Sequence, residues 1–149
     1  MRAGGSVKRG SLSLPWLFAL YAAATLLHFA HNAEYLAQYP NLPASWSRGE
    51  VYAAWCGLTA FGLGGYALYA CGYRRIGLAI LGWYAVLGFG GLLHYTRAPM
   101  AHHSATMNAT IWAEAAAGTV LLANVALLGR SSRGPMPPGL RRHRTRELT

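Results

Sequence analysis

Four long apolar runs constrain what this chain can fold into. Each is close to the ~20 residues that a helix needs to cross ~30 Å of hydrocarbon. The runs are rich in Ala and Leu and lack the alternating pattern of outer-membrane strands, which favours helix over strand. The sequence therefore predicts an all-α integral membrane bundle of four transmembrane helices. Their expected bounds are Leu14 to Tyr35, Val51 to Tyr73, Ile76 to Tyr95 and Met107 to Leu128.

Composition and connection lengths agree with this organisation. Only 11% of the 149 residues are charged, against about a quarter in soluble domains, so the chain has too few charges to cover a soluble globule. The connections are short, which makes successive helices antiparallel neighbours. We expect a basic N-terminus over residues 1–13, the four-helix domain over 14–128, and a disordered Arg-rich tail over 129–149.

The basic residues predict the orientation of the bundle. All 13 Lys and Arg residues except Arg48 and Arg97 lie before the first run, between the second and third, or after the fourth. By the positive-inside rule both termini should be cytoplasmic, in the inner (plasma) membrane of a bacterial-type cell. The alternative for the first run is a secretory signal ending near Ala24, but the apolar run continues past that residue.

The net charge of +9 also bears on partners. The basic residues sit between apolar runs and not on one face of a folded domain, so nucleic acid is not expected as a partner. The tail is expected to lie against anionic lipids of the bilayer. Many glycines in the second and third runs predict close helix packing, with a homo-oligomer or a larger membrane complex as the alternative use of that surface.

Ionisable side chains inside the apolar runs are the strongest functional signal, because each is costly in hydrocarbon. The first run carries the segment HFAHNAEY, with His28, His31 and Glu34. His94 ends the third run, and Glu114 lies in the fourth. Counting along antiparallel helices places all of these in the outer half of the bundle. We therefore expect a His/Glu site there.

Metal binding is the first chemistry that such a cluster suggests. His31 and Glu34 have the i, i+3 spacing that puts two ligands side by side on a helix. With Glu114, His28 and His94 they predict a mixed nitrogen and oxygen site for Zn, Fe or Mn. Glu34 and Glu114 are the candidate catalytic residues, and we expect them to act in one site. This reading predicts a metal-dependent membrane enzyme or a metal-binding protein, acting on a lipophilic or outer-face substrate.

A haem b-binding electron carrier is the main alternative. The segment Leu26-Leu27-His28-Phe29 recurs as Leu92-Leu93-His94-Tyr95, so two histidines on parallel helices could ligate a haem iron axially. Arg97 could then pair with a propionate. Against it, the estimated depths of His28 and His94 differ by about 9 Å.

Two further alternatives need no cofactor. A histidine and two carboxyl groups in a low-dielectric cavity would have shifted pKa values and could move protons on a lipophilic substrate. In residue type and architecture this is similar to the membrane sterol isomerases and their EXPERA-domain relatives, without a motif that aligns position by position. Alternatively, the polar residues only hold the helices together, as in a structural or assembly subunit of a membrane complex.

Overall fold

The computed structural model describes residues 13–43 and 45–131. Those residues form helices and connecting turns, with no strand among them, and four helical spans are long and apolar enough to cross a membrane. The predicted all-helical fold with four such helices is therefore confirmed. The elements are α1 (Leu14–Glu34), η1 (Leu36–Gln38), α2 (Arg48–Ala70), α3 (Arg74–Leu87), η2 (Gly90–Leu93), α4 (His94–Arg97), η3 (Met100–His102) and α5 (Ala105–Ser131).

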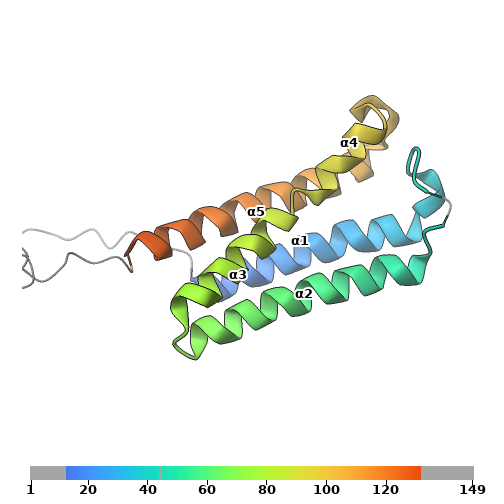
Figure 1. The fold of residues 1–149 in the computed structure, drawn as a ribbon. Coiled ribbons are helices and arrows are strands. Elements are labelled where there is room, and N and C mark those ends of the chain that lie inside the picture. The colour runs from blue at the N-terminus through green and yellow to red at the C-terminus, as the bar shows by residue number, and fades with distance from the viewer. Residues whose placement is uncertain (1–12, 44, 132–149) are drawn as a thin grey trace, which may run out of the picture.

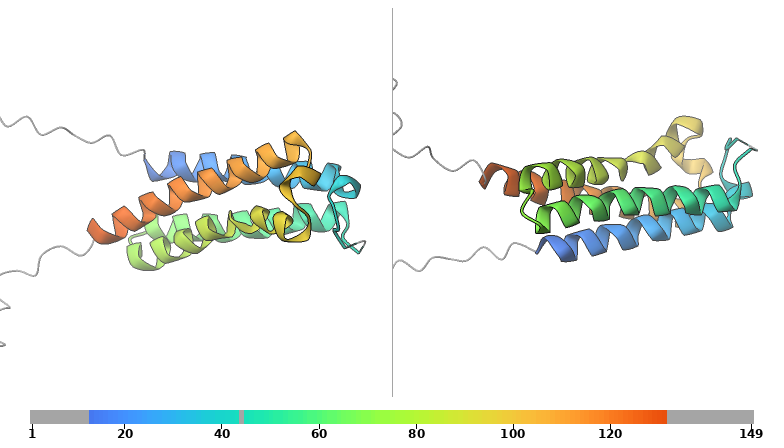
Figure 2. Two further views of the ribbon diagram at one scale, coloured as in Figure 1. Left: turned by 90° about the horizontal axis from the view of Figure 1, so that it is seen from above. Right: turned by 60° about the horizontal axis from the view of Figure 1, so that its bottom comes forward.

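The helices form an elongated bundle in which each long helix packs against two others (Figures 1 and 2). Helix α1 contacts α2 and α5, and helix α3 also contacts α2 and α5. The start of α1, the α2–α3 turn and the end of α5 lie at one end, on the left of Figure 1. Elements η1, α4 and η3 lie at the other end, which we call the loop end. This arrangement brings the polar ends of α1, α4 and α5 together.

The expected N-terminal and C-terminal segments lie largely outside the described residues. Residues 1–12 of the expected basic N-terminus and residues 132–149 of the expected tail are outside the described residues. Helix α5 continues to Ser131, three residues past the end expected from the sequence. Arg130 lies in its last turn, where a cation interacts favourably with the helix dipole.

A tight turn at Gly72 brings α2 and α3 together. The φ angle of Gly72 is +95°, in the left-handed region that suits glycine. The Tyr73 N–H donates to the Leu68 carbonyl at 2.9 Å and the Gly72 N–H to the Tyr69 carbonyl at 3.2 Å, the two bonds of a Schellman motif. Beyond the turn, a Cβ added to Gly77 would lie 2.5 Å from the Tyr69 backbone nitrogen. Glycine here serves close packing, as the sequence suggested.

Helix α3 ends earlier than the sequence predicts. The third apolar run was expected to be one helix to Tyr95, but α3 stops at Leu87 and the span continues as η2 and α4. At the break, the Gly88 N–H donates to Ala85 at 3.2 Å, and the Tyr21 hydroxyl of α1 donates to the Tyr84 carbonyl at 2.9 Å. The side chain of Tyr21 thus satisfies a carbonyl that a continued α-helix would have used.

The apolar core lies between the break and the end that carries the termini. Its buried side chains come from α1, α3 and α5 and include Phe18, Tyr21, Leu81, Tyr84 and Leu121. Large apolar side chains such as Trp16, Leu27, Leu63 and Trp83 instead point outward and are exposed, as expected for helices surrounded by lipid. The loop end contains most of the buried polar residues, and the candidate site lies there.

Candidate functional site

A histidine and a glutamate from two different helices meet inside the bundle. His28 of α1 and Glu114 of α5 are each only 2% exposed. The His28 Nε2 atom lies 3.7 Å from the Glu114 Oε2 atom. Because α1 and α5 pack directly against each other, residues 86 positions apart in sequence become neighbours. We call these two residues the His28–Glu114 pair.

Thr110 fixes which nitrogen of His28 carries hydrogen. The Thr110 hydroxyl donates its own proton to the Met107 carbonyl at 3.0 Å. Toward His28 Nδ1, at 3.4 Å, it can therefore only accept. A neutral His28 then has its N–H at Nδ1 and a lone pair at Nε2, facing Glu114. The Nε2 lone pair and an ionised Glu114 carboxylate would repel each other. The contact between His28 and Glu114 is therefore favourable only when one further proton lies between them.

The interrupted segment after α3 contacts this pair closely. A Cβ added to Gly91 of η2 would lie 2.9 Å from Glu114 Oε2 and 3.3 Å from His28 Nε2. A side chain at this position would displace one or both groups. The break at Gly88 thus lets the backbone of η2 cover the pair where an ordinary helix surface would carry side chains.

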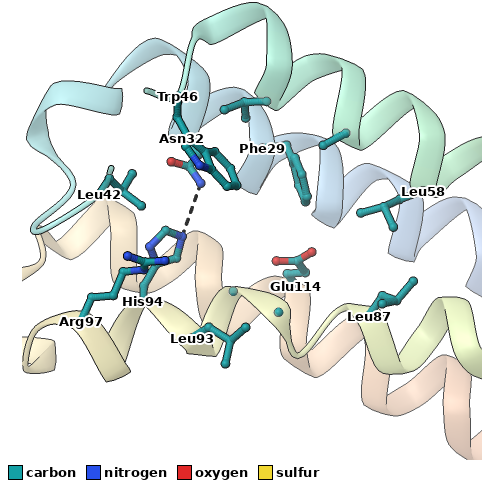
Figure 3. A pocket seen from close by; sticks show the side chains of 14 residues that line it. Phe29, Asn32, Leu42, Trp46, Leu58, Leu87, Leu93, His94, Arg97 and Glu114 are labelled. Atoms are coloured by element: carbon teal, nitrogen blue, oxygen red, sulfur yellow. Dashed lines mark hydrogen bonds between the residues drawn. The ribbon is translucent and has the colours of Figure 1, made fainter. Parts of the chain in front are cut away.

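A cavity of about 420 Å³ opens beside the pair. It lies between α2 on one side and η2 and α4 on the other. Beyond the break, η2 and α4 diverge from α2. In Figure 3 the Glu114 carboxyl points into it between Phe29 and Leu87. This volume falls within the ~300–1,000 Å³ of typical small-molecule sites. The lining residues are Phe29, Asn32, Leu42, Trp46, Val51, Ala54, Leu58, Leu87, Gly90, Gly91, Leu93, His94, Arg97 and Glu114.

Two buried polar atoms in this lining have no hydrogen-bond partner among the described residues. They are Glu114 Oε2 and Asn32 Oδ1, and their residues are 2% and 8% exposed. A buried polar atom without a partner costs about 1–3 kcal/mol. Such atoms in a cavity wall are typical of a site that a polar group of a ligand completes.

His94 lies beside the pair and closes one wall of the cavity. Its Nε2 atom is 3.4 Å from the Asn32 amide nitrogen, the contact drawn as a dashed line in Figure 3. Its ring centroid is 5.6 Å from that of His28 and 4.8 Å from that of Tyr39. The structure therefore brings together three of the predicted site residues: His28, His94 and Glu114.

The other two predicted residues make different contacts. His31 Nδ1 lies 2.9 Å from the Tyr39 hydroxyl. Glu34 is more exposed, and its Oε1 atom accepts from Arg48 at 2.8 Å and from Tyr52 at 2.8 Å. These bonds join α1 to the start of α2. Neither His31 nor Glu34 lines the cavity, so the i, i+3 spacing on one helix does not direct both side chains into it.

Tyr39 is a polar contact that sequence reasoning did not single out as a site residue. It is buried in the loop after α1, and its hydroxyl interacts with both His31 and Thr110. Burial raises the pKa of Tyr39 to about 12, so the phenol keeps its proton at neutral pH. His31, Tyr39, Thr110 and His28 thus form a continuous series of polar side chains that ends at Glu114. No periodic signal in the loop sequence could have indicated this.

The arrangement gives limited support to a metal or haem site. Across residues 13–43 and 45–131, no group of three or more His, Cys, Asp and Glu side chains is placed to share a metal ion. The ring centroids of His28 and His94 lie 5.6 Å apart. Metal and haem binding stay predictions.

Comparison with known proteins gives no relative. No family model, no curated protein and no solved structure matches this chain.

The contacts predict which substitutions are coupled. Glu114→Gln and His28→Gln should each destabilise the bundle by about 1–3 kcal/mol. The double variant should cost less than the sum, with a coupling of about 0.5–3 kcal/mol, because the two side chains contact each other. Unfolding in detergent measures these free energies, and simple additivity would contradict the paired placement.

Glu34→Gln is the matched control in the same measurements. It removes an exposed ion pair worth about 0.2–1 kcal/mol, and it should add to Glu114→Gln within about 0.5 kcal/mol. A strong coupling between the two glutamates would instead support the single site that the sequence led us to expect.

Proposed function

We propose that this protein is a membrane acid–base enzyme that moves a proton on a lipophilic molecule held in the cavity. The observation that carries the proposal is the His28–Glu114 pair, buried among apolar helices with its carboxyl facing a cavity of about 420 Å³. An ionisable residue inside a membrane domain is costly and is by default a functional residue. The pair supplies a proton donor and a proton acceptor side by side.

The simplest reaction for such a pair is the shift of a carbon–carbon double bond. The proton held by the pair adds to one carbon of the double bond. The pair then removes a proton from the carbon two positions away, and the double bond moves. Protons and electrons balance, the pair returns to its starting state, and no oxidant or reductant is consumed. Asn32 and His94 would orient a polar group of the substrate at the cavity wall.

Polar side chains between the pair and the loop end support this role. The side chains of His31, Tyr39, Thr110 and His28 connect the surface of the loop end with Glu114. Tyr39 retains its proton at neutral pH, because burial raises its pKa to about 12. To pass a proton along this series, Thr110 would turn its hydroxyl from the Met107 carbonyl toward His28 Nδ1. The series would let the pair exchange its proton with water without opening the cavity.

Deuterium exchange tests the proposal without a known substrate. The purified protein, in nanodiscs made with lipids from its own membrane, is incubated in D₂O. We expect deuterium at a carbon position of one lipophilic species, detected by mass spectrometry. Glu114→Gln should abolish this signal because it removes the exchangeable carboxyl proton, and the control Glu34→Gln should retain it.

Absence of deuterium with the unchanged protein, or equal incorporation by Glu114→Gln, would contradict the proposal. Metal analysis and an absorption spectrum of the same preparation complete the test. Stoichiometric Zn, Fe or Mn, or a Soret band lost on changing His28 or His94, would instead support the metal or haem predictions.

We also propose that the bundle lies in the inner membrane with both termini cytoplasmic and the loop end outside. The support is the charge distribution among the described residues. Arg74 and Arg75 lie at the end where α1 begins and α5 ends, whereas Arg48 and Arg97 lie at the loop end. The pair would then lie in the outer half of the bilayer.

Reporter fusions test this orientation. Green fluorescent protein fused after residue 149 should fluoresce, and alkaline phosphatase inserted within residues 98–104 should be active, because it folds only outside the cytoplasm. An active phosphatase at the C-terminus would reverse the orientation and with it the side from which protons reach Glu114.

A further inference from the structure

The cavity has one charged end and one apolar end. Arg97 and Leu42 lie at the same end in Figure 3, and Leu58 and Leu87 lie at the other. Along α2 the cavity is lined by Val51, Ala54 and Leu58, which span about 10 Å of helix. The Glu114 carboxyl faces the space between the two ends. A ligand that fills this cavity would therefore place its polar head near Arg97 and its hydrocarbon beside Glu114.

The charge of Arg97 is not balanced by any carboxylate among the described residues. Its guanidinium donates one hydrogen bond, to the Asn41 carbonyl at 3.3 Å. The carboxylates in the described part of the chain contact other residues: Glu34 contacts Arg48, Glu50 contacts Ser47, and Glu114 contacts His28. Because a guanidinium carries five N–H donors in a planar fork, most of its donors remain for a ligand.

Arg97 is exposed, and both its backbone and its side chain contact Asn41. The Asn41 side chain donates to the Arg97 carbonyl at 2.8 Å, and the Arg97 side chain returns a bond to the Asn41 carbonyl. These two bonds tie the end of α4 to the loop before α2 across the mouth of the cavity. A guanidinium that already makes a hydrogen bond loses less conformational entropy when it binds a ligand. Carboxylate and phosphate groups can accept two parallel hydrogen bonds from its planar N–H donors.

We infer that the ligand is a single-chain amphiphile with an anionic head, a carboxylate or a phosphate, which pairs with Arg97 at the cavity mouth. This inference depends on the proposed function, because it names the substrate class of the same cavity. The double bond that the His28–Glu114 pair acts on would lie in the hydrocarbon chain, several carbons from the head. A neutral molecule would leave the guanidinium without its partner.

Binding of matched probes tests the inference. The protein in nanodiscs of phosphatidylcholine is titrated with oleic acid, oleyl phosphate and oleyl alcohol, which share one hydrocarbon chain and differ in the head. We expect the two anionic probes to bind with one site per chain. Oleyl alcohol should bind at least about 10-fold more weakly, because it lacks the charge-assisted bonds to Arg97.

Substitution of the arginine separates this interaction from general lipid binding. Arg97→Gln should weaken oleate binding about 10- to 100-fold and leave oleyl alcohol unchanged, whereas Arg97→Lys should retain part of the oleate affinity. Arg48→Gln is the matched control, since Arg48 lies at the same end, is paired with Glu34 and does not line the cavity. Melting temperatures of all variants show that each is folded.

The outcomes distinguish the inference from the proposed function. Equal binding of acid and alcohol, unaffected by Arg97→Gln, would overturn the anionic head while leaving a lipophilic site. Displacement of oleate by added phosphatidylglycerol at equal concentration would overturn the single chain and indicate a bilayer lipid. Failure of all three probes to bind, together with no deuterium exchange, would overturn both proposals.

Discussion

The hydrogen bond from the Tyr21 hydroxyl to the Tyr84 carbonyl, 2.9 Å long, sets the geometry on which the site depends. It satisfies a backbone carbonyl where α3 ends, among buried side chains that shield it from water. The chain can then leave the helical path at Gly88. It continues as η2 and α4, which diverge from α2 (Figure 1). The cavity occupies the space that this divergence leaves.

The same break explains how a carboxyl group can be held inside an apolar helical bundle. Gly91 lets backbone approach Glu114 and His28 more closely than any other residue would allow. Thr110 orients His28 so that its free nitrogen faces the carboxyl. Glu114 Oε2, although it faces His28, and Asn32 Oδ1 have no hydrogen-bond partner among the described residues, and both residues line the cavity. A ligand bound in the cavity would supply the missing hydrogen bonds.

The sequence predicted much of the fold, because length and hydropathy alone identify helices that can cross a membrane. It also singled out His28, His94 and Glu114, which the structure brings together, since ionisable residues are conspicuous in apolar runs. It could not predict the break in α3, which depends on a tyrosine 63 residues away. Nor could it separate Glu34 from Glu114, because the partner of Glu34 is an arginine that begins the next helix. The roles of Tyr39 and Arg97 depend on loop geometry that has no periodic pattern.

Glu114 is a buried carboxyl group whose side chain faces an apolar cavity. Labelling with dicyclohexylcarbodiimide, an apolar reagent that adds to protonated carboxyl groups, tests whether this carboxyl can be reached from the cavity. We predict one adduct per chain, located at Glu114 by peptide mass spectrometry, absent in Glu114→Gln and slowed by oleic acid. Glu34, which is exposed and paired with Arg48, should instead react with a water-soluble carbodiimide. No adduct at Glu114, or preferential reaction of Glu34 with the apolar reagent, would contradict the account.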